Sequence, residues 1–342
     1  MTPGKQKGGA LLTVLWLSAA LAAIAFSVAT KVRSETARVG STADVLRASY
    51  LASGSVERAI QWMIWSSDFP TQFWRRTRPR LYFTYGSGDV VVETFAESAK
   101  LNINQAGYDD IFRVVAAVSG NLMQARDITD AIMDWRGGGV GSAFDAYYAS
   151  IGPSLGVPTF RARHASFQEI EELLLVRGMT PELYFGNYVS DNQGRLYPSG
   201  GLRDCFSVWG STGPFDANGV SPALMQAIGV PPDGVARIMA RRQVAPFQNF
   251  GDVAGLGVPT PRLTVGPSTP NGVIWTVRAT ARLRRPDGTP SDVVRSASAT
   301  VKLLDPTIYP MLPVHVLRWY DDGWSQSEVV PPGPVTGVAL PQ

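Results

Sequence analysis

The stretch QKGGALLTVLWLSAALAAIAFSVATK, residues 6–31, decides the fold of this chain. It carries no charged residue between Lys7 and Lys31, and about twenty apolar residues in an α-helix are enough to cross the hydrocarbon core of a bilayer. Lys5 and Lys7 lie before the apolar run and favour a cytoplasmic N-terminus, although basic residues beyond Thr30 weaken the asymmetry. The sequence therefore predicts one membrane helix, with most of the chain on the far side.

Three interpretations of this segment are open. A secretory signal has a shorter apolar region, about 7–15 residues, and ends at small residues, which LAA and SVA supply. An uncleaved anchor requires no processing. A short leader cut before the helix fits best, because the apolar run continues without a break into an amphipathic extension, residues 31–65. There Val39, Leu46, Tyr50, Val56, Ile60 and Met63 recur at spacings that predict one packed helical face.

Composition narrows the class of protein. With 342 residues and 45% hydrophobic content, the chain has material for one large domain with an insertion, or for two modules. Cys205 is the single cysteine, which excludes an intramolecular disulfide and a cysteine-based zinc site. The two histidines, His164 and His315, are too few for a histidine-rich metal site, and a net charge of +3 is weak evidence for nucleic-acid binding.

Strand patterns lie at both ends of the soluble region. RLYFTYGSGDVVVETFAE, residues 80–97, predicts a β-hairpin with a glycine-rich turn. Residues 272–285 and 291–304 predict two further strands joined by the turn Pro-Asp-Gly-Thr-Pro. Apolar and polar residues alternate in the first of these strands, so we expect a sheet with one solvated face.

The residues between these strands predict helices. One begins near Tyr108 and a second covers residues 124–135. Residues 166–189 predict two short helices joined at Arg177-Gly178-Met179, and residues 220–242 predict a pair joined at Gly229. Strands interrupted by such a block and then resumed indicate a helical domain inserted into a sheet-based head.

Several runs resemble the K-type minor pseudopilins of type II secretion systems, within the type IV pilin superfamily. They are LNIN (101–104), DAIMDW (130–135), DAYY (145–148), ASFQEIEELLLVRGMTPELY (165–184) and the helix pair around Gly229. The resemblance implies an α+β fold in which a long N-terminal helix packs on a small antiparallel sheet that carries a large inserted all-α domain.

The expected domain organisation follows from the same resemblance. It comprises a leader (1–8), a transmembrane helix (9–30), a periplasmic helix extension with the first strands of the head (31–100), an inserted α domain (101–200), a helix-turn-helix pair and connection (201–260), the C-terminal strands of the head (261–330) and a flexible tail (331–342).

The resemblance also implies processing by a prepilin peptidase, which cuts after a glycine, methylates the new N-terminus and leaves a glutamate at the fifth mature position. A cut between Gly8 and Gly9 makes Thr13 the fifth residue, and a cut after Gly9 puts Val14 there, so the glutamate is absent in either case. In the superfamily this buried carboxylate meets the amine of the preceding subunit. A subunit with Thr13 has no such charge and is expected at the fibre tip. Alternatively, Thr13 is a tolerated polar residue bonded to its own helix carbonyls.

The implied function is that of a minor pseudopilin at the tip of the secretion pseudopilus, where it primes or caps fibre assembly for protein export across the outer membrane. We expect a single-pass protein of the bacterial inner membrane with a periplasmic soluble domain. Its expected partners are the I- and J-type minor pseudopilins, the major pseudopilin, the prepilin peptidase and, at the tip, secretin and cargo. Close helix packing in the membrane would use Ala19, Ala20, Ala22 and Ala23.

Calcium is the structural ion that the resemblance implies. Calcium takes six to eight oxygen ligands, and Asp134, Asp145 and Asp191 are the candidate carboxylates. The sequence has no Dx[DN]xDG loop, and the loop after Trp135, RGGGVGSAF, is nearly uncharged.

A membrane-anchored, exported helix-hairpin-helix DNA-binding protein is the alternative function. In that arrangement backbone amides at a glycine turn hold a phosphate. Arginines accompany both glycine turns, namely Arg177 at Gly178, and Arg237, Arg241 and Arg242 near Gly229. Four glutamates around Gly178 would repel phosphate, and we therefore predict no nucleic-acid partner.

No enzyme motif stands out in the sequence. There is no GxSxG, HExxH or P-loop, and neither histidine lies in a nucleophile motif. We predict no catalysis.

Overall fold

The computed structural model describes residues 9–65, 80–137, 139, 141–153, 156, 160–190, 193–194, 196–266, 273–304, 309, 311, 313–321 and 323. The predicted leader with Gly8, the calcium candidate Asp191 and the predicted flexible tail lie outside these residues.

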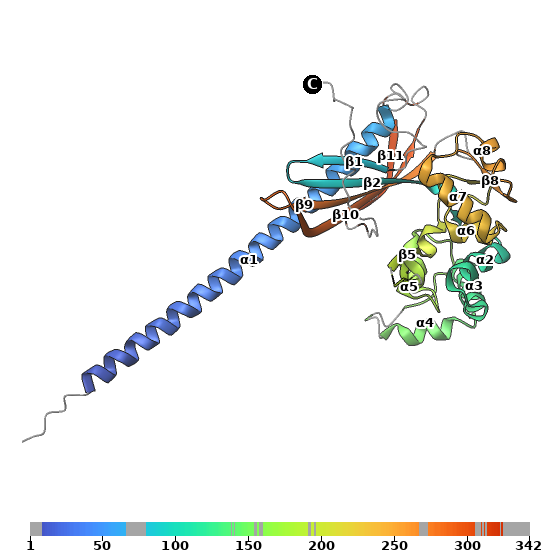
Figure 1. Cartoon of the computed structure of the whole chain (residues 1–342). Coiled ribbons are helices and arrows are strands. Elements are labelled where there is room, and N and C mark those ends of the chain that lie inside the picture. The colour runs from blue at the N-terminus through green and yellow to red at the C-terminus, as the bar shows by residue number, and fades with distance from the viewer. Residues whose placement is uncertain are drawn as a thin grey trace, which may run out of the picture.

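The N-terminal helix α1 (Gly9–Trp65) is continuous over 57 residues. Its first half extends away from the rest of the protein, and its C-terminal part packs on the sheet of the head (Figure 1). The predicted run of one helix from the apolar segment into the soluble region is therefore confirmed. Gly40 and Gly54 lie within the helix without interrupting it.

The head contains one antiparallel sheet of five strands in the order β1-β2-β9-β10-β11. The strands are β1 (Arg80–Tyr85), β2 (Gly88–Ala96), β9 (Val273–Arg284), β10 (Pro290–Leu303) and β11 (Val314–Tyr320). Both predicted hairpins form, and β11 is an additional edge strand that the sequence did not predict. The central pairing of β2 with β9 requires glycine at Gly88, because a Cβ there would lie 2.4 Å from the carbonyl oxygen of Arg282.

Small residues bring α1 close to one face of the sheet. Ala48, Ala52 and Ala59 are fully buried in the interface, together with Val56, Ile60 and Met63. The sheet presents small residues in return, including Ala279 and Ala299.

The predicted apolar face of the helix is only partly right. Val56, Ile60 and Met63 are buried, whereas Val39, Leu46 and Tyr50 are 63%, 51% and 76% exposed. The reason is steric. The face of the helix that packs on the sheet contains the small alanines, which allow close approach, and the larger residues Val39, Leu46 and Tyr50 lie outside this face.

The other face of the sheet is polar and largely buried. Thr280, Ser296, Ser298 and Thr300 are each less than a tenth exposed. Cross-strand hydroxyl pairs satisfy this face, with 2.9 Å between Thr276 Oγ1 and Thr300 Oγ1 and 3.1 Å between Ser296 Oγ and Thr280 Oγ1. The prediction of a solvated face was therefore wrong, because alternation reports polarity and cannot report what covers it.

The inserted region begins after η1 (Glu97–Ala99) and ends with β8 (Leu263–Thr264). One hydrophobic cluster runs through it from Leu101 to Leu263 and crosses the predicted boundary at residue 200, so the two predicted segments share a core. Its helices are α2 (Tyr108–Ser119), α3 (Leu122–Gly137), α4 (Asp145–Ile151), η3 (Ile170–Leu175), α5 (Pro181–Phe185), η4 (Leu202–Asp204), α6 (Pro222–Ala227), α7 (Pro232–Val244) and α8 (Phe250–Ala254).

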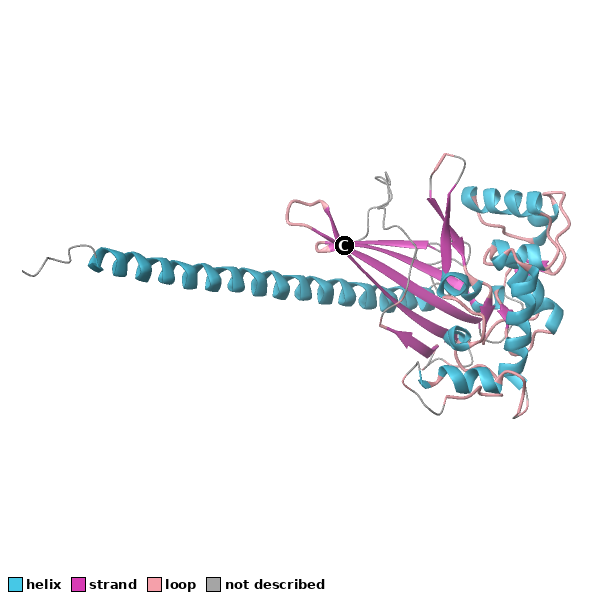
Figure 2. Ribbon diagram, turned by 90° about the horizontal axis from the view of Figure 1, so that it is seen from below, coloured by secondary structure: helices cyan, strands magenta, loops and turns pink. Residues whose placement is uncertain are grey.

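The inserted region is not all-α, which corrects the prediction. β3 (Leu101–Asn102) pairs in parallel with β6 (Phe206–Ser207), and β7 (Phe215–Asp216) pairs in parallel with β8. β4 (Gly186–Ser190) and β5 (Leu196–Gly200) form a hairpin. The parallel pairs are two residues long, too short to give a strand pattern in the sequence. The inserted region lies at the end of the head away from the first half of α1 (Figure 2).

The inserted region repeats one set of contacts. Asn104 accepts from the backbone N–H of Phe167 at 2.8 Å and donates to its carbonyl at 2.9 Å. Asn218 does the same with Phe247, at 2.9 Å and 3.0 Å. Three further residues of the first copy have an equivalent with the same contacts in the second. Arg136 corresponds to Arg242, Met133 to Met239 and Glu172 to Asp252.

Each copy thus closes a helix pair in the same way. A half-buried arginine at the end of α3 or α7 donates to two backbone carbonyls of the loop that precedes its helix pair. An asparagine in that loop fixes the segment after the second helix. The inserted region is therefore built from two copies of one unit, residues 101–178 and 215–257.

Replacing either asparagine tests this repeated design. Asn104→Ala and Asn218→Ala each remove a pair of backbone contacts and leave a buried N–H and carbonyl unpaired, so each should lower the free energy of unfolding of the inserted region by about 1–3 kcal/mol. Hydrogen exchange of the Phe167 and Phe247 amides in the full chain measures the effect. The exposed neighbour Gln105→Ala is the control and should change stability by less than about 0.5 kcal/mol. Unchanged exchange in both asparagine variants would contradict the assignment.

Candidate functional site

The apolar half of α1 is the first candidate functional surface. α1 is long and apolar enough to cross a membrane, by length and composition, and its apolar residues are exposed in the isolated chain, with Leu11 at 76%, Trp16 at 73% and Phe26 at 73%. The four alanines predicted for helix packing, Ala19, Ala20, Ala22 and Ala23, lie on this exposed stretch. Their role in packing stays a prediction.

Thr13 lies in the first turns of α1, and its hydroxyl donates to the carbonyl of Gly9 at 2.7 Å. This bond satisfies the hydroxyl within its own helix, as the simpler interpretation of Thr13 requires. The side chain at this position of α1 carries no charge. Gly9 is the first described residue, and the predicted cleavage after Gly8 lies at the limit of the structure.

The soluble part of α1 before the head is the second candidate surface. Val39, Leu46 and Tyr50 are exposed there, and two surface ion pairs accompany them, Glu35 with Arg38 at 3.0 Å and Asp44 with Arg47 at 3.1 Å. Exposed pairs of this kind stabilise the helix only by about 0.3–0.5 kcal/mol each. An apolar stripe on a bare helix is instead suited to contact with other helices.

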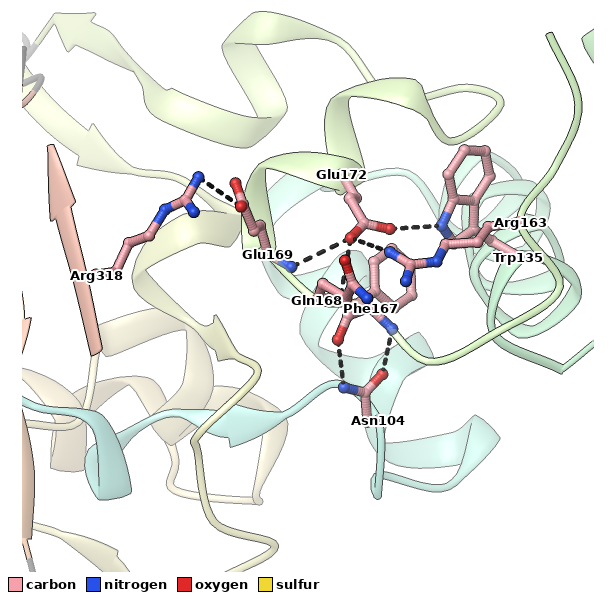
Figure 3. Close-up of polar contacts among 8 residues, drawn as sticks. All are labelled: Asn104, Trp135, Arg163, Phe167, Gln168, Glu169, Glu172 and Arg318. Carbon is pink, nitrogen blue, oxygen red and sulfur yellow. Dashed lines mark hydrogen bonds and ion pairs between the residues drawn. The ribbon is translucent and has the colours of Figure 1, made fainter. Parts of the chain in front are cut away.

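Polar contacts fix the inserted region to the head. Glu169, just before η3, forms an ion pair of 2.5 Å with Arg318 of the edge strand β11 (Figure 3). Glu97 lies at the crossover between the two parts, where its carboxylate accepts from Lys100 at 3.0 Å and from Thr276 at 2.7 Å. Burial alone raises the pKa of Glu97, but Lys100 and the hydroxyl donors outweigh burial and hold it below its usual value.

Glu172 organises the segment that carries Glu169. Its carboxylate accepts from the indole N–H of Trp135 at 3.2 Å, from Arg163 at 2.9 Å and from the backbone N–H of Gln168 at 2.8 Å (Figure 3). Asn104 holds the adjoining Phe167 in the same view. The result is a rigid η3 segment that presents Glu169 to the head. Sequence reasoning treated these glutamates as charges that would repel phosphate. It missed their structural role because Trp135 and Arg318 lie far from them in the chain.

Two calcium candidates face a histidine instead of each other. His164 Nε2 lies 2.8 Å from Asp145 Oδ1, and His164 Nδ1 lies 3.1 Å from the carbonyl and 3.9 Å from Oδ2 of Asp134. The imidazole separates the two carboxylates, so they do not converge on the many oxygen ligands that calcium requires. Among the described residues no group of three histidine, cysteine or acidic side chains is arranged to hold a metal ion. These residues do not fit a calcium site.

The charges of this cluster are coupled. Burial lowers the pKa of His164, but its bonds to Asp145 and Asp134 outweigh burial and raise it. The bond from His164 lowers the pKa of Asp145, and backbone donors such as Gly141 add to this. His164 has a φ of 46°, in the left-handed region that few non-glycine residues occupy, and these contacts hold it there.

The arginines at the glycine turns are engaged within the protein. Arg242 donates to the carbonyls of Ala217 and Val220, and Arg241 donates to that of Ala245. Further contacts engage the other two, Arg237 with Asp233 and the Leu256 carbonyl, and Arg177 with the rings of Phe144 and Tyr147. These contacts disfavour the DNA-binding alternative, which needs the cations free for phosphate.

Cys205 is a buried residue of the inserted core. Its sulfur lies 3.1 Å from Ser221 Oγ, and burial raises the pKa of the thiol to about 12. A thiol of this kind is not ionised near neutral pH and is a poor nucleophile.

A long half-exposed helix, a five-stranded antiparallel head and a distal insertion together define a pilin-like α+β fold. No family model and no curated protein matches the chain. Among solved structures, the chain is similar to a chain of the GspK-GspI-GspJ complex from the enterotoxigenic Escherichia coli Type 2 Secretion System, with a TM-score of 0.52 and 14% identity over 84% of this chain and 100% of that chain. The predicted α+β, pilin-like fold class is confirmed.

Replacing Asp145 tests the charge coupling. The raised pKa of His164 means that the pair stabilises the protein fully below pH 6.5 and that this contribution is lost as the pH rises through the folded pKa. The lowered pKa of Asp145 means that its contribution is present above pH 3.8 and is lost as the pH falls through the folded pKa. Asp145→Asn should therefore lower the urea midpoint most near pH 5 and least near pH 9.

The exposed Asp127→Asn on α3 is the matched control and should show no such pH dependence. An equal loss of stability by Asp145→Asn at both pH values would contradict the coupling.

Proposed function

We propose that this chain is a minor pseudopilin at the tip of a type II secretion pseudopilus, where it primes or caps fibre assembly for export across the outer membrane. The observation that carries the proposal is the combination, in one chain, of a bare apolar helix and a pilin-like head with a distal insertion. The structural match to a chain of the GspK-GspI-GspJ complex supports it. The role is mechanical, and no catalysis is proposed.

The membrane arrangement follows from α1. Its apolar half would lie in the inner membrane with the N-terminus in the cytoplasm, and the head would lie in the periplasm. A prepilin peptidase would cut after Gly8, and the new N-terminus would begin the helix at Gly9. Small residues at Ala19, Ala20, Ala22 and Ala23 would allow close approach of neighbouring helices, including that of the major pseudopilin.

Two features support the tip position. Thr13 carries no charge, so its helix does not require the amine of a subunit above it. The inserted region lies at the end of the head away from the membrane helix (Figure 2), where it would obstruct the addition of a further subunit. A tip position would also bring this region towards secretin and cargo.

The exposed stripe of α1 is the proposed contact with I- and J-type minor pseudopilins. Leu46 and Tyr50 lie on either side of Ala48, the first buried residue of the helix, and the head leaves both exposed. Helices of partner subunits would cover them in a bundle.

The mass of the protein from native membranes tests the processing. We expect a chain that begins at Gly9, shorter by the eight leader residues and heavier by one methyl group. A start at Ala10 would shift the cut by one residue. An intact Met1, or a start beyond residue 30, would contradict prepilin-type processing.

Replacement of the exposed stripe tests the partner contact. The full chain should copurify with the I- and J-type minor pseudopilins of the same organism, and Leu46→Glu with Tyr50→Glu should abolish this because two charges would be desolvated in the bundle. Leu122→Glu, at a position 66% exposed on the inserted region, is the matched control and should preserve the complex. An intact complex in the double variant would contradict the proposed contact.

A further inference from the structure

A pocket of about 390 Å³ lies between the polar face of the head sheet and the inserted region. The sheet contributes Thr276, Arg278, Ser298 and Thr300 to its lining. The inserted region contributes side chains from three of its elements, namely Glu171 of η3, Phe185 of α5 and Arg203 of η4. None of the residues that line this pocket belongs to α1, the helix proposed to contact the membrane and the partner subunits.

Arg278 is the central charge on the sheet side. It lies on β9, directly between Glu93 of β2 and Ser298 of β10 in the register. Its guanidinium stacks over Phe95, with 4.8 Å to the ring centroid, and forms no ion pair with a described residue. Glu93, the nearest acid in the register, pairs with Arg80 at 3.0 Å. A half-buried guanidinium with five donors and no close ion pair is suited to an oxyanion, although Asp204, Glu93 and Glu97 attract it at longer range.

Arg203 adds a second cation from the opposite wall. It lines the pocket from the inserted region and stacks on Phe185 at 5.5 Å from the ring centroid. Burial and repulsion by Arg203 both lower the pKa of Arg278, so an anion between the two would relieve the repulsion. The third cation, Lys100, is already neutralised by Glu97 at 3.0 Å. The hydroxyl of Ser298 offers a further donor, whereas that of Thr300 is engaged with Thr276.

Two acids line the pocket, Glu97, which pairs with Lys100, and Glu171, and the second narrows the chemical class of the ligand. Glu171 Oε2 is buried and has no hydrogen-bond partner among the described residues. An anion that carries only negative charge would be repelled there, whereas a ligand with an N–H or ammonium donor near its carboxylate would satisfy this oxygen.

We propose that this pocket binds a carboxylate next to an N–H donor, with the carboxylate between Arg278 and Arg203 and the donor facing Glu171. Two sources share this chemistry, a free α-amino acid and an acidic residue of a peptide segment. Because the pocket joins the head to the inserted region, an occupant would contact both parts and favour their present arrangement.

Calorimetric titration of the full chain in detergent tests the proposal, with L-glutamate as one probe and the blocked peptide acetyl-Gly-Glu-Gly-amide as the other. At least one probe should bind at millimolar concentration or below. Arg278→Gln should weaken this binding at least about tenfold, the loss expected for one charge-assisted contact. Arg295→Gln, an exposed arginine of the neighbouring strand, is the control and should bind as the unchanged chain does. Arg203→Gln repeats the test from the other wall if Arg278→Gln does not fold.

The outcomes separate the two sources. Binding of glutamate alone supports a free amino acid, and binding of the peptide alone supports a protein segment. Binding of both supports the pocket for either source. The absence of binding by both probes, or equal binding by the Arg203→Gln and Arg278→Gln variants and the unchanged chain, would overturn the proposal.

Discussion

One continuous helix must satisfy two different surroundings, and the rest of the structure depends on this constraint. The segment of α1 from Gly9 to Thr30 has no charge and no cover from its own chain, so its apolar surface requires lipid or other helices. The second half is buried on a sheet, and there the contact is made by alanines that let the helix lie close to the strands. Between them lies a stretch that is helical but uncovered. The helix is held rigidly at one end only, which is the arrangement expected of a subunit that completes its packing in an assembly.

The inserted region is made from two copies of one helix pair around a shared hydrophobic core. In each copy a half-buried arginine and an asparagine close the unit with backbone contacts. The copies differ where the first one meets the head. There Glu172 holds Arg163 and Trp135, and Glu169 reaches Arg318 of the edge strand. Asp252 of the second copy accepts from the Gln248 amide, and Asn249 takes the place of Glu169. The first copy is thus adapted to attachment, and the proposed mechanical role requires an insertion that does not swing on the head.

The long helix, both hairpins and most helices were predictable, because each follows from periodicity or turn residues within a short window. The packed face of α1 was only partly predictable, since burial of Ala48 and Ala52 depends on the sheet rather than on hydrophobicity. The buried polar face around Thr276 was missed for the same reason. The repeat was visible in two short signals, Phe-Gln at residues 167–168 and 247–248 and Ile-Met-x-x-Arg at residues 132–136 and 238–242, each too short to stand alone. The pairing of Asp134 and Asp145 with His164 could not be inferred, because it depends on loops that bring residues 19 and 30 positions apart together.

The tip position is the central claim, and labelling of assembled pseudopili tests it most directly. A gold-binding tag inserted at the exposed turn after Asp287, on the full chain, would be viewed by electron microscopy on fibres sheared from cells. The account predicts one label at a single end of each fibre, because the insertion would prevent addition above this subunit. Labels distributed along the fibres would contradict it.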